Sequence, residues 1–169
     1  TRCAAMQVMA LPFEERFGGV GADFTTTVHA MNALGYACTD GGLVHAIATQ
    51  ILCGLQLKMF GSEELQQRYL PRICTGELVF AQAITEPGSG SDAMAMRTRA
   101  VRGDDGYVLD GSKTFITNGP IADAVIVFAI TRPDVTPLMG VSAGVVEKKD
   151  RGFERCAPLQ KMGLTTLHN

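Results

Sequence analysis

The residues best suited to chemistry lie in one short loop, residues 85–92 (TEPGSGSD), after an apolar run that begins at Leu78. Small residues leave the main chain accessible, and glycine lets another molecule approach the backbone closely. Gly88, Gly90 and Ala93 fit the relaxed fingerprint G-x-G-x-x-A, in which backbone amides hold the pyrophosphate of a dinucleotide. The loop therefore predicts a contact between backbone and ligand, and a dinucleotide-binding turn is one interpretation.

Two nucleotide-binding interpretations fail on the residues that follow this loop. The dinucleotide fingerprint needs a long helix and then a parallel strand. Residues 94–111 instead alternate in polarity and contain Gly-Asp-Asp-Gly at 103–106, which is typical of a hairpin. A nucleoside-triphosphate loop needs Gly-Lys followed by Ser or Thr, which does not follow here. A plain loop of turn-forming residues also explains the composition, and on these residues alone it remains an alternative.

A second stretch, residues 111–123 (GSKTFITNGPIAD), favours a ligand-binding loop over a plain loop at residues 85–92. It combines an aromatic, a β-branched residue and a threonine within a short extended run at residues 113–117. An Asn-Gly pair follows at residues 118–119 and predicts a turn. The side chains of Phe115 and Thr117 could contact the same ligand as the glycine loop, residues 85–92, only if the two stretches lay side by side. The fold must therefore bring them together.

The first half of the chain has helical periodicity. Apolar residues recur at three- and four-residue spacing over residues 24–34 and again over residues 43–59. Asp23 is suited to cap the first of these helices, which we expect to end at Gly35. The second helix is expected to end at Gly61.

A third helix is predicted to begin after Ser62. The Ser62 hydroxyl can cap the helix, and Glu63 and Glu64 favour its positive first turn. Pro71 lacks the amide hydrogen that a helix interior needs, so we expect a kink or a break near Leu70.

Beyond residue 78 the pattern changes to short strands without helices between them. The strand-like runs, separated by Gly, Asp and Pro, cover residues 107–109, 113–117, 124–130 and 141–146. This spacing indicates an antiparallel sheet or barrel. The predicted fold class is α+β, with an N-terminal helical domain over residues 1–77 and an antiparallel, barrel-like middle β domain over residues 78–169.

Composition narrows the functional class. The 169 residues are 46% hydrophobic and 19% charged, which is typical of a folded globular protein. A net charge of −2 provides no electrostatic reason to expect nucleic acid or an anionic membrane as partner. The apolar stretch 43–57 is interrupted by polar side chains, so no membrane span is expected. The five cysteines form no CxxC pair and no metal spacing, which favours reduced thiols, a cytoplasmic location and no metal site.

The two ends suggest a piece of a longer protein. The chain begins at Thr1 without methionine and stops at Asn169, after residues that resemble the approach to another strand. We therefore expect a fragment.

Together, the two stretches resemble the acyl-CoA dehydrogenase family, which carries A-x-T-E-P-x-x-G-S-D and, further along, K-x-(W/F)-I-T-N-G. Three more segments match family elements in the correct order: residues 11–21 (LPFEERFGGVG), residues 60–71 (FGSEELQQRYLP) and residues 161–163 (KMG). The resemblance thus covers nearly the whole chain.

The resemblance implies a helical N-terminal domain, a middle β domain and a C-terminal four-helix domain, the last of which is absent from this chain. It implies FAD as cofactor, between the middle domain and the C-terminal helices. The implied reaction oxidises an acyl thioester such as acyl-CoA to the α,β-unsaturated thioester: a carboxylate removes the α-proton and the β-hydrogen leaves as hydride to flavin N5.

The same resemblance implies partners and a location. The substrate would be an acyl-CoA or a carrier-protein thioester, and the electron acceptor a protein such as electron-transfer flavoprotein. A homodimer or homotetramer is expected, in the bacterial cytoplasm or, in a eukaryote, the mitochondrial matrix.

Two alternatives to an acyl-CoA dehydrogenase stay open. Residues 35–43 and 119–123 also resemble relatives that oxidise acyl or aminoacyl groups tethered to carrier proteins. A non-catalytic binding module that retains the fold would have the same motifs, and the sequence beyond this chain would distinguish it from an enzyme.

Individual roles also follow from the resemblance. Thr85 and nearby backbone amides would bond the pyrimidine edge of the flavin, and Ser91 would contact the thioester or its pantetheine arm. Phe115 would lie against the ring face away from the substrate, and Thr117 would place its hydroxyl near N5. The implied cofactor-binding residues are Gln82, Ala83, Ile84, Thr85, Gly90, Ser91, Phe115, Ile116 and Thr117, with Ser91 also the implied substrate-binding residue.

No catalytic residue is implied within this chain. The family takes its catalytic glutamate from the C-terminal domain, so the chain alone is expected to bind FAD poorly and to be inactive. Glu86 has the chemistry of a general base, but its place in the family motif makes it structural.

Overall fold

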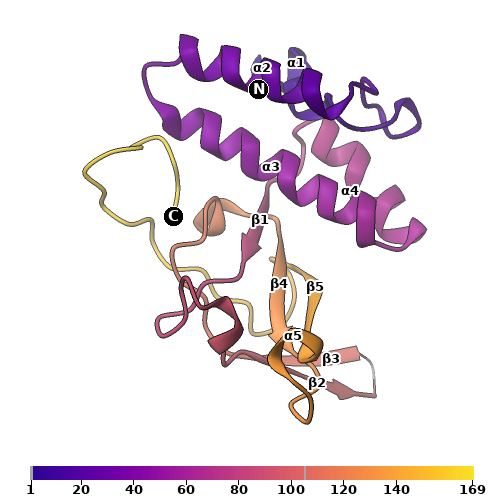
Figure 1. The fold of residues 1–169 in the computed structure, drawn as a ribbon, viewed down its shortest axis with the longest axis vertical. Coiled ribbons are helices and arrows are strands. Elements are labelled where there is room, and N and C mark those ends of the chain that lie inside the picture. Colours follow the sequence, from indigo (N-terminus) through magenta and orange to yellow (C-terminus); the bar gives the residue numbers. More distant parts are fainter. Residues whose placement is uncertain (1, 105) are drawn as a thin grey trace.

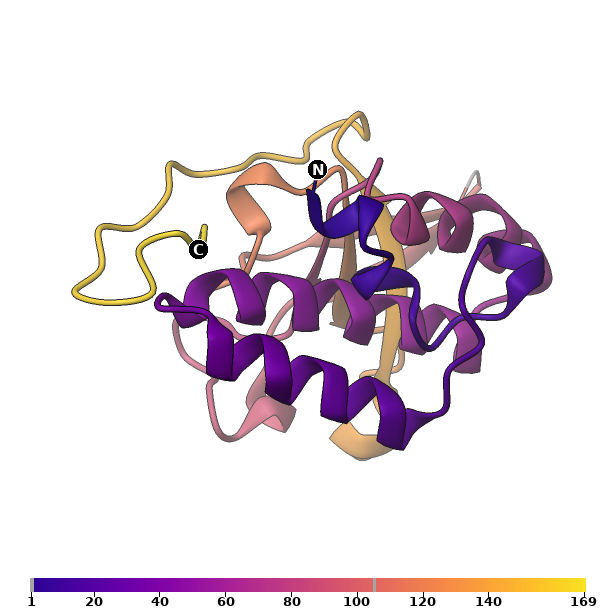
Figure 2. The ribbon, with the colours of Figure 1, turned by 90° about the horizontal axis from the view of Figure 1, so that it is seen from above.

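A layer of helices lies above a β-sheet in the computed structural model, which describes residues 2–104 and 106–169 (Figure 1). Three long helices dominate this layer: α2 (Phe24–Ala37), α3 (Gly41–Phe60) and α4 (Glu63–Cys74). They follow α1 (Arg2–Ala5) and the 3-10 turns η1 (Val8–Ala10) and η2 (Glu15–Phe17). Helices α2 and α3 run side by side in both views (Figure 2).

The strands occupy the second part of the chain. They are β1 (Phe80–Ala83), β2 (Arg99–Gly103), β3 (Gly106–Asp110), β4 (Ala124–Ile130) and β5 (Val141–Glu147). The connections include η3 (Ala93–Ala95), η4 (Gly119–Ile121) and the short helix α5 (Pro137–Gly140). The predicted α+β order, helices first and sheet second, is confirmed.

Helix α2 begins where the sequence predicts but continues beyond the expected end. The Asp23 carboxylate accepts a hydrogen bond from the Thr26 amide at 2.7 Å, which confirms the cap. The expectation that α2 ends at Gly35 is wrong, because the helix continues to Ala37. One glycine costs a helix only about 1 kcal/mol relative to alanine, which is too little to end it. Helix α3 ends at Phe60, as predicted, before Gly61.

Helix α4 shows one correct and one wrong prediction. Ser62 caps it by accepting a hydrogen bond from the Leu65 amide at 3.3 Å. The break expected near Leu70 does not occur, because α4 continues through Pro71 to Cys74. Leu70 and Ile73 are both fully buried, and their packing offsets the one amide bond that a proline removes.

The sheet is mixed, which corrects the expectation of wholly antiparallel pairing. Strands β2 and β3 form an antiparallel hairpin, and β4 and β5 are also antiparallel. Strand β1 instead lies parallel to β4, with Phe80 opposite Ala124, and β2 meets β4 in parallel at Arg99 and Ile130. The chain between β1 and β4 is long enough to include the whole hairpin, so β4 can re-enter the sheet in the direction of β1.

The strand predictions mostly succeed. The bounds of β4 are those of the predicted run 124–130, while β3 and β5 contain the runs 107–109 and 141–146. The run 113–117 is not a strand, which corrects that expectation. Its Phe115 adopts a left-handed backbone with φ of 55°, which interrupts any extended conformation.

The helical layer and the sheet share one hydrophobic core. Phe13, Phe17 and Ile73 from the helical layer pack in the same cluster as Phe80 of β1 and Ile126 of β4. A domain boundary between residues 77 and 78 therefore stays a prediction, because this core continues across it.

Helix α3 connects the core to the sheet through a buried polar side chain. The Gln50 side chain donates to the Leu78 carbonyl oxygen at 2.8 Å and accepts from the Phe80 amide at 2.5 Å. These bonds hold the start of β1 under α3. By length and composition α3 could cross a membrane, although one such helix is weak support for a span and core helices meet the same criteria.

Candidate functional site

The two stretches that the sequence predicts to act together lie side by side. The Thr114 amide donates to the Thr85 carbonyl oxygen at 2.9 Å. The Lys113 ammonium, one residue earlier, donates to the Ile84 carbonyl oxygen, also at 2.9 Å. The end of β1 and the segment 113–118 are thereby joined along their backbones.

The predicted residues of the first stretch differ in exposure. The Ala83 side chain is buried in a small cluster with Ala81, Ala122 and Val125, against which the half-buried Ile116 also packs. Only the backbone of Ala83 could therefore face a ligand. Gln82, Ile84 and Thr85 are half-buried, whereas Gly90 and Ser91 are exposed.

A tight turn holds the glycine loop. Glu86 and Ser89 exchange two backbone hydrogen bonds, at 2.9 Å and 3.1 Å, and the Ser89 hydroxyl donates to the Asp92 carbonyl oxygen at 2.7 Å. Neither Gly88 nor Gly90 has a left-handed backbone. A side-chain carbon at either position would meet no atom of the described residues within 4 Å. The packing of this chain does not require these two glycines.

Phe115 combines an unusual backbone with an exposed ring. Its φ is 55°, a conformation that costs a bulky residue about 1–2 kcal/mol, and 67% of its surface is exposed. Thr117 lies nearby, half-buried, and its hydroxyl oxygen accepts a long hydrogen bond from the Asn169 side chain at 3.4 Å. A strained residue that presents an aromatic ring to the outside is a candidate ligand contact.

Glu86 is held as a structural anion, as the sequence interpretation expects. One carboxylate oxygen accepts from the Thr98 amide at 3.0 Å, the Thr98 hydroxyl at 2.5 Å and the Lys113 ammonium at 2.8 Å; the other accepts from the Arg97 amide at 2.6 Å. Burial alone would raise the pKa of Glu86, but the hydrogen bonds from Lys113 and Thr98 outweigh it and lower the pKa to about 2. Glu86 is therefore ionised at neutral pH and unsuited to accept a proton.

Two residues that organise this site were not predicted from the sequence. Lys113 is the buried partner of Glu86, and only its place in the K-x-F-I-T-N-G motif could have indicated this. Asn118 is 3% exposed, with φ of 64°, a region that asparagine tolerates better than most residues. Its side chain donates to the carbonyl oxygens of Ala46 and Phe80, both at 3.4 Å, so it ties α3 and β1 to the turn that was expected only to reverse the chain.

The C-terminal residues pass close to the same region. The Asn118 amide donates to the His168 carbonyl oxygen at 2.7 Å. The yellow segment in Figures 1 and 2 also reaches the N-terminal end of α3, where the Thr166 amide donates to the Asp40 carboxylate at 3.2 Å.

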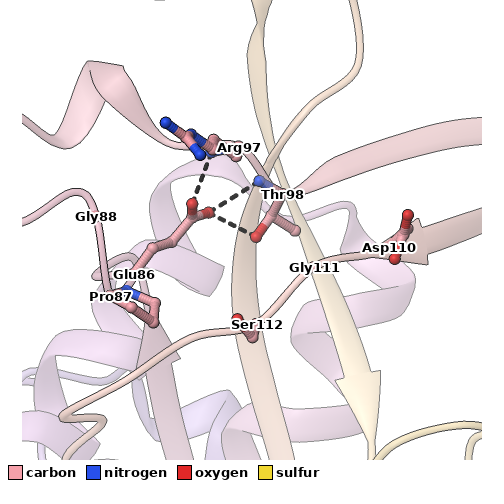
Figure 3. Close-up of a pocket in the computed structure, with 8 residues that line it drawn as sticks. All are labelled: Glu86, Pro87, Gly88, Arg97, Thr98, Asp110, Gly111 and Ser112. Atoms are coloured by element: carbon pink, nitrogen blue, oxygen red, sulfur yellow. Dashed lines mark hydrogen bonds between the residues drawn. The ribbon is translucent and has the colours of Figure 1, made fainter.

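A pocket of about 370 Å³ opens beside the glycine loop (Figure 3). The Glu86 carboxylate points across it towards Arg97 and Thr98, and Asp110 lies on the far side. The pocket borders the loop but includes none of the predicted cofactor-binding residues. Its lining residues are Glu86, Pro87, Gly88, Arg97, Thr98, Asp110, Gly111 and Ser112.

Comparisons with known proteins agree with this arrangement. Residues 1–77 match the family described as Acyl-CoA dehydrogenase, N-terminal domain, and residues 81–169 match Acyl-CoA dehydrogenase, middle domain. The chain is 38% identical over 157 residues to an acyl-CoA dehydrogenase of Bacillus subtilis, covering 93% of this chain and 41% of that protein. It is 37% identical over 164 residues to an L-prolyl peptidyl-carrier-protein dehydrogenase of Pseudomonas fluorescens, covering 96% and 43%.

A solved structure gives the same result in three dimensions. The FAD complex of PigA superposes with a TM-score of 0.93 at 36% identity, covering 99% of this chain and 45% of that one. The chain spans less than half the length of the relatives that it matches. The family profiles, the sequence identities and the superposition all agree: this chain belongs to the acyl-CoA dehydrogenase family and comprises its N-terminal and middle domains.

Proposed function

We propose that the complete protein is an FAD-dependent dehydrogenase that oxidises an acyl thioester to its α,β-unsaturated form. The observation that carries this proposal is the backbone hydrogen bond between Thr114 and Thr85. It joins the glycine loop, residues 85–92, to the aromatic segment, residues 113–118. This bond, with the one from Lys113 to Ile84, joins the segment that includes Phe115 and Thr117 to the end of β1, which supports a ligand contact that both stretches share.

The residues of this region fit FAD. Phe115 offers an exposed aromatic face, and the open space at Gly88 and Gly90 lets a flat ligand approach the backbone. The Thr85 hydroxyl has no hydrogen-bond partner among the described residues, so it remains available to a ligand. Contacts among the described residues do not account for these features, which supports a bound ligand as their explanation.

The roles that we assign to this chain are to bind and to orient. Phe115 would cover one face of the ring and exclude water from it, while Thr85 and the loop amides would donate to its polar edge. The Thr117 hydroxyl could turn its proton towards the cofactor. FAD, when bound, would supply the two-electron acceptor that no side chain provides. The base that removes the α-proton would come from outside this chain.

The substrate class follows from the relatives. Identities of 38% to an acyl-CoA dehydrogenase and 37% to a prolyl carrier-protein dehydrogenase do not favour either substrate. Both acyl-CoA and a loaded carrier protein present a thioester on a pantetheine arm. The exposed Ser91 is our candidate contact for that thioester.

A carrier-tethered aminoacyl group is the second candidate substrate. It is favoured by the similarity to the solved prolyl acyl carrier protein oxidase AnaB, with a TM-score of 0.91 at 37% identity, and by a second prolyl carrier-protein dehydrogenase, from Serratia, that is 41% identical over 143 residues. We further propose that an electron-transfer flavoprotein reoxidises the enzyme, and that it works as a homo-oligomer in a compartment where thiols stay reduced.

Anaerobic flavin reduction tests the proposal. The complete protein should purify with bound FAD and show oxidised flavin absorption, which should bleach on addition of its thioester substrate. Candidate acyl-CoAs should be compared with prolyl and acyl groups on a carrier protein, with free CoA and unloaded carrier as controls. Protein without FAD, or FAD that no thioester bleaches, would contradict the proposal. The thioester that bleaches fastest would choose between the two substrates.

A further inference from the structure

Among the ion pairs of the described residues, the one between Lys113 and Glu86 is the most deeply buried. The two charged atoms are 2.8 Å apart, and the side chains are only 9% and 7% exposed. Burying two charges is costly, so a pair of this kind needs good geometry and further hydrogen bonds to be tolerated. Glu86 meets these requirements, because its carboxylate accepts hydrogen bonds from Lys113, from the Arg97 amide and from the amide and hydroxyl of Thr98.

Lys113 does more than neutralise Glu86. Its ammonium also donates to the Ile84 carbonyl oxygen at 2.9 Å, at the end of β1. The next residue, Thr114, donates through its amide to Thr85. Two successive residues, Lys113 and Thr114, thus fix three successive residues, 84–86, at the end of β1.

This arrangement controls the backbone on both sides of Phe115. The bonds of Lys113 and Thr114 hold the chain before it, and the buried Asn118 holds the chain after it through Ala46 and Phe80. A left-handed phenylalanine persists only where its surroundings determine its conformation.

We propose that Lys113 is a positioning residue, which through Ile84 and Glu86 sets the backbone of residues 84–86 against the Phe115 ring at the distance that FAD requires. This inference rests on the proposed function, because it assumes FAD between these two segments. The Lys113 side chain is only 9% exposed and its ammonium is bonded to Ile84 and Glu86, so we assign it no contact with the reacting atoms. Its effect reaches the cofactor only through the backbone that it holds.

Two substitutions separate positioning from plain stability. Lys113→Met removes the ammonium and both of its bonds, whereas Lys113→Arg keeps a charge and several donors. In the complete protein Lys113→Met should raise the Kd for FAD about tenfold, as expected for losing bonds to a charged group, and should change the visible circular dichroism of bound FAD. In Lys113→Arg, the Kd for FAD and the circular dichroism of bound FAD should both return close to their wild-type values.

A core substitution that leaves the bonds of Lys113 in place provides the matched control. Phe13 is fully buried in the helical layer, so Phe13→Leu should lower the melting temperature without removing any bond of Lys113. Its Kd for FAD and its flavin dichroism should stay at wild-type values. If Lys113→Met does not fold, Lys113→Gln retains a neutral donor and is judged by the same criteria.

The outcomes are distinguishable. Wild-type protein that binds no FAD would overturn the proposed function and this inference with it. If the wild type binds FAD, a Lys113→Met variant with unchanged Kd and dichroism would overturn the inference alone. Equal flavin changes in Phe13→Leu and Lys113→Met would also overturn it, since they would follow from lost stability. A selective effect of Lys113→Met, rescued by arginine, would support it.

Discussion

The Thr114 amide and the Thr85 carbonyl oxygen are joined at 2.9 Å, and this bond unites two stretches that are far apart in the sequence. Since both partners are backbone groups, only a proline at position 114 would remove the donor, and it would also restrict the backbone. Tests of the region must therefore address the side chains and glycines around it.

Phe115→Ala should separate cofactor binding from folding. The ring is 67% exposed, so we expect the unfolding free energy of the cofactor-free protein to change by about 1 kcal/mol or less. FAD affinity should fall by about tenfold, since an aromatic contact to a ring contributes on the order of 1 kcal/mol or more. Urea unfolding and FAD titration measure the two effects.

The buried Phe13 gives the control for that comparison. Phe13→Ala should cost about 3–5 kcal/mol of unfolding free energy, because its side chain is completely enclosed. A Phe115→Ala variant that was destabilised as much as Phe13→Ala would mean that Phe115 is a core residue and not a ligand contact.

Gly90→Ala should affect ligand binding more than folding. An added methyl group meets no described atom within 4 Å, so the cofactor-free protein should be unchanged or about 0.5 kcal/mol more stable. If FAD or the thioester lies against this backbone, its affinity should fall. Thermal melts and ligand titrations of the same samples provide the measurement.

Gly111→Ala is the matched control for a glycine that the fold does require. Its φ is +154°, and an added carbon would lie 2.4 Å from the Thr98 hydroxyl oxygen. We expect a loss of about 2 kcal/mol or more of unfolding free energy. A Gly90→Ala variant that melted as early as Gly111→Ala would contradict the open space seen at Gly90.

Gln50→Leu should be strongly destabilising. It would leave the Leu78 carbonyl and the Phe80 amide buried without their partner, which we expect to cost about 3 kcal/mol. Gln56→Leu provides the contrast, because the buried Gln56 side-chain oxygen has no hydrogen-bond partner among the described residues. Urea unfolding should show a large loss for the first variant and a change of about 0.5 kcal/mol or less for the second.

The lowered pKa of Glu147 predicts that the protein loses stability in acid. Hydrogen bonds from Lys149 and Tyr69 lower the pKa of Glu147 to about 2, from an ordinary value of 4.5. The unfolded chain therefore binds more protons between these values, so the stabilisation is complete above pH 4.5 and is lost as the pH falls towards 2. Because Lys149 is mostly exposed and screened by solvent, we expect a contribution on the order of 1–2 kcal/mol.

The variant Glu147→Gln isolates this contribution. Unfolding free energies measured from pH 6 to pH 2.5 should fall less steeply in the variant than in the wild type. Identical slopes would show that Glu147 does not titrate differently in the folded and unfolded states.

Local features of the fold were predictable from the sequence. The β-branched run of β4 and the caps at Asp23 and Ser62 depend on neighbouring residues, and the structure confirms all three. Predictions failed where distant packing decided the outcome. Pro71 stays helical because the core holds its neighbours, and β1 pairs with β4 in parallel because of the long connection between them.

The candidate site shows the same division. The family motifs identified both flavin-facing stretches, and the structure brings them together, although their contacts with FAD remain predictions. The extended run expected at residues 113–117 was wrong, because tertiary bonds set the backbone of Phe115. Lys113 pairs with Glu86 and Asn118 with Ala46, and no local periodicity indicates such long-range partners.

The core that Phe13, Phe80 and Ile126 share has a consequence for recombination between relatives. If the chain were expressed from residue 78 onwards, the sheet would lose the helices that cover Phe80 and would expose an apolar surface to the solvent. Chimaeras that join the first half of one homologue to the second half of another should therefore aggregate unless the core residues of the two halves still pack together.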